Sequence, residues 1–236
     1  HILQRRNAAE DYPEALRDEA ARRFAAMDDA RKQELVANIV FGLPGAAERQ
    51  TMEDVRALLD SYAPVTDAVL RRNFHAFLEQ VAPVAQDLGM RLCCHPDDPP
   101  FPLLGLPRIM STEADYAERM AAVDLPANGI TLCSGSLGAR PDNDLPGMMR
   151  RFGDRVHFLH LRNVRRDTET VPASFFEDDH LGGQTDMVEL IDAVLAEEGR
   201  RRAAGREDAV IPMRPDHGQD ILDDIGRGGQ PGYPAI

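Results

Sequence analysis

From residue 90 onward, short apolar runs alternate with longer stretches of helical periodicity. The apolar runs are typical of buried strands and lie at residues 90–94, 129–133, 156–161 and 209–213. The helical stretches between them lie at residues 113–123, 144–151 and 186–199. Strands separated by helices are typical of βα units, in which the strands lie parallel. This alternation therefore predicts an α/β protein.

The number of βα units suggests part of a TIM barrel. A complete (β/α)8 barrel needs eight units and typically about 250 residues. This chain of 236 residues shows four units. We therefore expect residues 1–236 to be the C-terminal portion of a single TIM-barrel catalytic domain. Its N-terminal strands are missing from the chain and should lie upstream of His1.

The first 88 residues show helical rather than strand periodicity. Over residues 13–39, apolar side chains such as Leu16 recur every three or four positions, which predicts an amphipathic helix broken once. Thr51 followed by two acidic residues indicates a helix start, and a further helix is predicted over residues 67–88. We expect residues 1–88 to be a mainly helical insertion, and residues 89–236 to carry the βα units and the functional site.

Charge and cysteine usage narrow the function classes. The formal net charge of -13 disfavours nucleic acid, whose phosphates need a basic surface. No apolar run of about 18 residues is present, so we expect no membrane span. Three cysteines, an odd number, are typical of free thiols in a reducing cytoplasm. We expect a cytoplasmic protein that acts on a small molecule and forms a homo-oligomer, a dimer or larger.

Polar side chains follow each of the four predicted strands. His95, Cys133, His160 and Asp216 lie at, or just after, the carboxyl end of one strand each. In a parallel barrel these ends meet on the rim where barrel enzymes place their sites. A set of two imidazoles, a thiolate and a carboxylate suits Fe(II), Mn(II), Co(II) or Zn(II), whereas the thiolate disfavours Mg(II) and Ca(II). The pattern predicts a transition-metal site.

Each of these residues also has an ordinary structural interpretation. A single histidine at a strand end usually forms a hydrogen bond, a free cysteine packs as a small apolar side chain, and an aspartate often caps a helix. The equivalent position of all four in successive βα units favours the metal site. By strand alternation, His157 faces away from His160, and we interpret it as structural.

Five longer motifs resemble one family. They are HPDDPPFPLLGLPRI at residues 95–109, ANGITLCSGSLGARPDND at 127–144, VHFLHLRNV at 156–164, DDHLGGQTDM at 178–187, and RPDHG at 214–218 with PGY at 231–233. Together they closely resemble D-mannonate dehydratase, a family of sugar-isomerase-like (xylose-isomerase-like) TIM barrels. The resemblance covers roughly residues 40–236.

The resemblance implies an activity and roles for individual residues. It implies a hydro-lyase that converts D-mannonate to 2-dehydro-3-deoxy-D-gluconate (2-keto-3-deoxy-D-gluconate) and water in hexuronate (glucuronate) catabolism. It implies Mn2+ or Fe2+ held by the four matching residues His95, Cys133, His160 and Asp216. It also implies that His217 and Tyr233 transfer protons, without deciding which is the acid and which the base.

The substrate carboxylate needs a basic partner. Arg162 and Arg214 are the nearest arginines to the predicted rim, and we expect them to bind this carboxylate together with Asn163 and His180. An arginine near a strand end is equally often paired with an acidic neighbour, so this alternative stays open.

Two other functions are compatible with the sequence. A sugar isomerase or epimerase of the same barrel superfamily is one, although such enzymes more often use carboxylate-rich metal sites. A non-catalytic relative that binds a metal or a sugar acid is the other. Product analysis with D-mannonate separates the three, since it gives a keto-deoxy acid, an isomer or no turnover.

Overall fold

A computed structural model describes residues 1–5, 7–40 and 51–216 of the chain. The predictions for His217 and Tyr233 therefore lie outside the described residues. The chain divides into two compact units, His1–Ala68 with Pro102–Pro107, and Val69–Phe101 with Arg108–Ile236. The prediction of a single domain stays a prediction. Every helix in the described part is too short or too polar to cross a lipid bilayer.

Helices dominate the first 88 residues, as their periodicity indicates. They are α1 (Glu14–Ala26), α2 (Asp29–Val40), α3 (Met52–Ser61) and α4 (Asp67–Asp87). The break between α1 and α2 matches the predicted interruption, and Thr51 forms a capping box with Asp54 at the start of α3. The apolar positions predicted for α1 are not buried in the described residues. No residue of α1 is buried, and Leu16 is 47% exposed.

A four-stranded parallel sheet forms the centre of the second unit. Its strands follow the order β1 (Leu92–Cys94), β2 (Asn128–Cys133), β3 (Val156–His160) and β6 (Met213–Arg214). All three strand pairs are parallel. The α/β class is thus confirmed. The sheet fits part of a TIM-barrel-like fold, although the described strands do not close a barrel.

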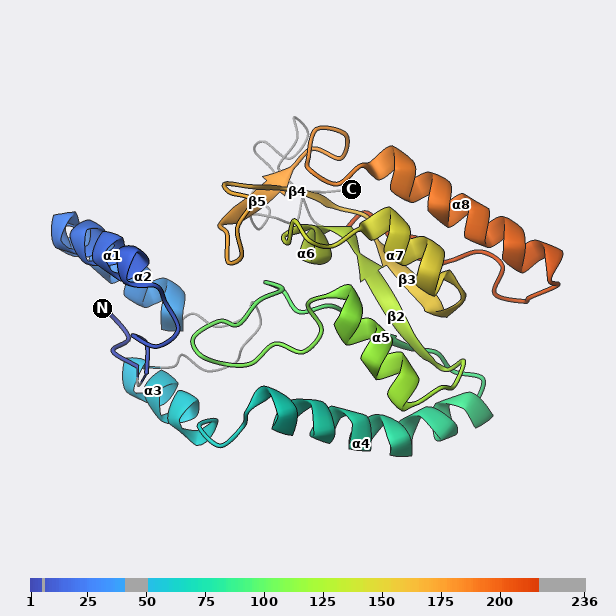
Figure 1. Cartoon of the computed structure of the whole chain (residues 1–236), viewed down its shortest axis with the longest axis horizontal. Coiled ribbons are helices and arrows are strands. Elements are labelled where there is room, and N and C mark those ends of the chain that lie inside the picture. Colours follow the sequence, from blue (N-terminus) through green and yellow to red (C-terminus); the bar gives the residue numbers. More distant parts are fainter. Residues whose placement is uncertain (6, 41–50, 217–236) are drawn as a thin grey trace. The chain divides into compact units, whose positions relative to one another are not determined.

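Three helices cover one face of this sheet (Figure 1). They are α5 (Glu113–Ala122), α7 (Leu145–Phe152) and α8 (Met187–Ala203), close to their predicted ranges. The main core lies between them and the strands, where Ile130 and Leu132 of β2 and Leu159 of β3 are at most 1% exposed. Burial of each such side chain contributes about 1.5–3 kcal/mol, so this face specifies the register of the sheet.

One predicted strand is shorter than expected, and one pair of strands was not predicted. The fourth predicted strand, residues 209–213, is confined to β6 at Met213–Arg214, because Pro212 has no N–H for the ladder and contributes only its carbonyl, which accepts from Leu159 N at 3.0 Å. An antiparallel hairpin of β4 (Asn163–Arg166) and β5 (Phe175–Asp178) was not predicted. Its strands have four residues each, too short for periodicity to identify.

Candidate metal centre

Strand alternation places Cys133 and His160 side by side. Leu132 and Leu159 point into the core on the helix-covered face, so the next residue of each strand points to the opposite face. Cys133 and His160 are also register partners in the parallel β2–β3 pair. The last residues of two neighbouring strands thus direct a thiol and an imidazole to one point at the carboxyl edge of the sheet.

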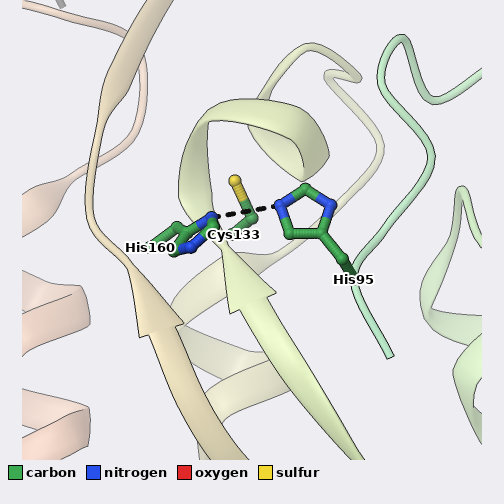
Figure 2. Close-up of side chains that lie close together, drawn as sticks. All are labelled: His95, Cys133 and His160. Atoms are coloured by element: carbon green, nitrogen blue, oxygen red, sulfur yellow. Dashed lines mark hydrogen bonds between the residues drawn. The ribbon is translucent and has the colours of Figure 1, made fainter. Parts of the chain in front are cut away.

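His95 joins this pair from the loop after β1. Its Nε2 lies 3.1 Å from Nδ1 of His160. The ligand atoms of His95, Cys133 and His160 all lie within 4.8 Å of one another. Figure 2 shows the two imidazole rings on either side of the Cys133 side chain, joined by the dashed line between their nitrogens. The structure therefore brings together three of the four residues that the sequence predicts as ligands.

The donor set and its spacing fit a transition metal. Two atoms bound to one ion at about 2.0–2.3 Å stand roughly 3–4 Å apart, which is close to the separation of the two imidazole nitrogens. Nδ1 of His95 donates a hydrogen bond to the Pro96 carbonyl at 2.7 Å. This bond leaves the Nε2 lone pair of His95 directed at the cluster, as metal-binding histidines require.

Asp216, the fourth predicted ligand, lies beside this cluster just after the end of β6. Its Oδ2 lies 3.9 Å from Sγ of Cys133 and 3.6 Å from Nδ1 of His160. The residue adopts a left-handed backbone conformation with φ of 67°, which aspartate tolerates better than most residues. The turn directs a carboxylate that is 9% exposed toward the thiol.

The short helix α6 (Ser134–Gly138) begins directly at Cys133. The Ser136 N–H points at Sγ of Cys133, with the nitrogen 3.5 Å from the sulfur, and Oγ of Ser136 lies 3.3 Å from the same sulfur. Oγ of Ser134 donates to the carbonyls of His160 at 3.1 Å and Arg162 at 2.6 Å. These bonds connect the ends of β2 and β3 and hold the thiol in place.

Arg162 is buried beside the cluster rather than open to a ligand. Its side chain is 3% exposed. The guanidinium contacts three carboxylates, Asp98 at 2.7 Å, Glu177 at 3.2 Å and Asp216 at 3.8 Å. Its predicted role in binding the substrate carboxylate stays a prediction. The contacts favour the other interpretation of an arginine at a strand end, pairing with acidic neighbours.

The other predicted substrate residues differ in exposure. The amide of Asn163 donates to the carbonyls of His180 and Thr185, both at 2.9 Å, and its oxygen accepts from Thr185 N at 3.1 Å. Asn163 is 1% exposed and holds the loop that carries His180, whose side chain is exposed. Arg214 is 50% exposed and lies 3.7 Å from Oδ1 of Asp216, so it has room for a ligand.

His157 is placed away from the cluster, in agreement with its structural interpretation. Its Nε2–H donates to the Pro126 carbonyl at 2.8 Å, and the residue is 7% exposed. Burial lowers the pKa of His157, because the charged imidazolium is poorly solvated there. The neutral form therefore predominates in the folded protein near neutral pH.

The sequence did not single out three residues of this site. Asp98 lies within the stretch after the first strand, and Ser136 follows the cysteine by three residues, so both were visible as polar residues near a strand end. Glu177 had no such signal, because it lies in the hairpin that was not predicted.

Fold and cluster together define a class of protein. The chain is an α/β protein with a site suited to a divalent transition metal at the carboxyl edge of a parallel sheet. Its similarity to known proteins is more specific. The profile of the D-mannonate dehydratase family (UxuA) matches residues 6–236. The chain belongs to this D-mannonate dehydratase family.

Individual relatives agree with the family profile. Mannonate dehydratase 1 of Agrobacterium fabrum is 59% identical over all 236 residues, and mannonate dehydratase of Rhizobium meliloti is 56% identical over the same length. The chain spans 59% of the length of each. A crystal structure of mannonate dehydratase from Streptococcus suis serotype 2 matches 76% of this chain and 48% of its own, with 30% identity and a TM-score of 0.65.

Proposed function

We propose that the full-length protein is a mannonate dehydratase, a hydro-lyase that removes water from D-mannonate and releases 2-dehydro-3-deoxy-D-gluconate. One observation carries the proposal. In a chain that belongs to this family, His95, Cys133 and His160 direct their ligand atoms to one point. The proximity of Asp216 to Cys133 and His160 supports a fourth ligand.

The proposed cofactor is Mn2+ or Fe2+. His95, Cys133, His160 and Asp216 would hold it, and the thiolate in this set disfavours the harder cations. When bound, the metal supplies Lewis-acid stabilisation of negative charge on substrate oxygens. Metal analysis of protein purified without added metal, by mass spectrometry, distinguishes manganese from iron.

The chain's own residues would move the two protons of the reaction. A general base removes the proton from C2, and a general acid protonates the departing hydroxyl at C3. We propose His217 and Tyr233 for these roles, on the strength of the family motifs alone. Arg214, half-exposed next to Asp216, is well placed to bind the substrate carboxylate. His180 is proposed to assist it from the loop that Asn163 holds.

The decisive experiment is product analysis with the full-length protein. After metal removal, Mn2+ or Fe2+ is returned and D-mannonate is added. Metal-dependent formation of a 2-keto-3-deoxy acid supports the proposal. An isomeric sugar acid as product would support an isomerase or epimerase instead. Absence of turnover with metal bound would support a non-catalytic relative that binds a metal or a sugar acid.

Replacement of Tyr233 by Phe is expected to lower kcat roughly 100-fold while metal content stays normal. The change removes only the hydroxyl, and loss of a general acid or base typically costs about 100- to 10,000-fold. Steady-state kinetics with D-mannonate and metal analysis provide the two readings. If KM rises and kcat does not change, the hydroxyl only binds substrate, and His217 remains the proposed acid–base group.

We propose that the protein acts in the cytoplasm and forms a homo-oligomer. Cys93, Cys94 and Cys133 are free thiols, which supports a reducing compartment such as the cytoplasm. The expected homo-oligomer stays a prediction, and light scattering of the full-length protein in solution tests it.

A further inference from the structure

The guanidinium of Arg162 connects three segments that lie far apart in the sequence. Nη2 donates to Oδ2 of Asp98, in the loop after β1, at 2.7 Å. Nη1 lies 3.2 Å from Oε1 of Glu177 in β5 and 3.8 Å from Oδ2 of Asp216 after β6. A side chain that is 3% exposed and contacts three carboxylates is held in one position. The Arg162 side chain therefore links the loop after β1, strand β5 and the segment after β6.

The segment after β2 is shaped to receive this arginine. The side chain of Ser134 is fixed in one orientation, because its hydroxyl donates a hydrogen bond to the Arg162 carbonyl at 2.6 Å. A Cβ on Gly135 would overlap the Arg162 side chain, so only glycine fits there. Ser136 donates to the same Asp98 oxygen as the guanidinium, at 3.1 Å. Three consecutive residues after Cys133 therefore each accommodate Arg162 or its partner.

Carboxylates neutralise the positive charge of Arg162 within the site. Burying a guanidinium costs free energy unless nearby carboxylates compensate for it, and here Asp98 lies at 2.7 Å, Glu177 at 3.2 Å and Asp216 at 3.8 Å. An arginine side chain is always positively charged in proteins, so the buried guanidinium attracts the Asp216 carboxylate.

We propose that Arg162 is a positioning residue that acts through Asp216. Its guanidinium holds the Asp216 carboxylate toward Cys133 and His160 before metal or substrate binds, and Gly135 provides the space that this requires. The proposal rests on the proposed metal site. It differs from direct binding of the substrate carboxylate, because its effect on metal affinity does not depend on substrate.

The test measures Mn2+ affinity of the full-length protein without substrate, by competition with a chelator of known affinity. Arg162→Met is expected to weaken Mn2+ binding roughly 10- to 100-fold, the usual effect of losing a partner that orients a metal ligand. Arg162→Lys keeps the charge but not the planar fork and is expected to lose less. Arg165→Met is the matched control, because Arg165 is half-exposed and pairs with Asp178.

Gly135→Ala tests the same proposal without changing any charge. The added methyl group must displace Arg162, so Mn2+ affinity is expected to fall in the same direction as in Arg162→Met. Gly199→Ala in α8 is the control, since a Cβ there meets nothing within 4 Å. Thermal unfolding of each variant establishes that it is folded. Should Arg162→Met fail to fold, Arg162→Lys and Gly135→Ala carry the test.

The kinetic readout separates positioning from substrate binding. Positioning predicts that excess Mn2+ restores most of kcat in Arg162→Lys, while KM for D-mannonate changes little. Unchanged Mn2+ affinity together with a raised KM would overturn the proposal and assign Arg162 to the substrate carboxylate. If the wild-type protein binds no Mn2+, the proposed metal site itself fails, which is a different result from equal binding by wild type and variants.

Discussion

Replacement of Cys133 by Ser is expected to remove most of the proposed metal from the full-length protein and with it nearly all of the proposed dehydratase activity. Sγ is completely buried, lies within 4.8 Å of the ligand nitrogens of His95 and His160, and is 3.9 Å from Oδ2 of Asp216. A serine hydroxyl is a harder donor than a thiolate and does not ionise at neutral pH, so it cannot replace the sulfur.

The expected loss of metal affinity is at least about 100-fold. Loss of a partner that only orients a ligand already costs roughly 10- to 100-fold, and Cys133 would be a ligand itself. Metal content after purification and Mn2+ titration without substrate both measure the effect. The fold should survive, because serine has nearly the same volume as cysteine.

Cys93→Ser provides the matched control. Cys93 is exposed, lies in the neighbouring strand β1 and is not part of the cluster. The same chemical change at this position is expected to leave metal content and activity unaltered. Equal metal content in the Cys133 and Cys93 variants would show that Cys133 is only a packed core residue.

Replacement of Arg201 by Met is expected to lower the free energy of unfolding by about 3–5 kcal/mol, the usual cost of breaking a buried ion pair. Arg201 lies in α8 and its side chain is 2% exposed. Nε donates to Oε1 of Glu197 at 2.9 Å, and Nη2 donates to the carbonyls of Gly153 at 2.6 Å and Val156 at 2.7 Å. The substitution leaves a buried carboxylate and two buried carbonyls short of a donor.

Arg200→Met is the matched control, because Arg200 pairs with the same glutamate at an exposed position. Arg200 pairs with the same Glu197 carboxylate at 2.6 Å, but its side chain is 57% exposed. Exposed ion pairs contribute about 0–1 kcal/mol, so its loss should be small. Urea denaturation of both variants measures the difference. Similar values for the two variants would mean that the hydrogen bonds of Arg201 to the carbonyls of Gly153 and Val156 contribute little to stability.

Local patterns in the sequence were sufficient to locate the long elements and to predict that His95, Cys133 and His160 lie together. Helical periodicity identified α4, α5, α7 and α8 to within a few residues, because each is amphipathic over at least two turns. His95, Cys133 and His160 follow or end three parallel strands, so they lie together at the carboxyl edge of the sheet. The predicted ligand types follow from these positions alone.

Short elements and buried pairing were decided by tertiary structure. The β4–β5 hairpin has no periodicity of its own and is held by bonds such as that between Arg165 and Asp178 at 2.6 Å. A strand as short as β6 depends on its neighbour β3, because the N–H groups of Leu159 and Leu161 donate to the carbonyls of Pro212, just before β6, and of Arg214 within it.

The sequence by itself determined that an α/β sheet presents two imidazoles, a thiol and a carboxylate near its strand ends, because strand direction and side-chain alternation are local properties. Only the tertiary structure decided what Arg162 does. Its contacts come from Asp98, Glu177 and Asp216, which precede or follow it by many residues and arrive through three different loops or strands. A buried charge has to be neutralised by whichever carboxylates the fold brings near, and no local pattern specifies which those are.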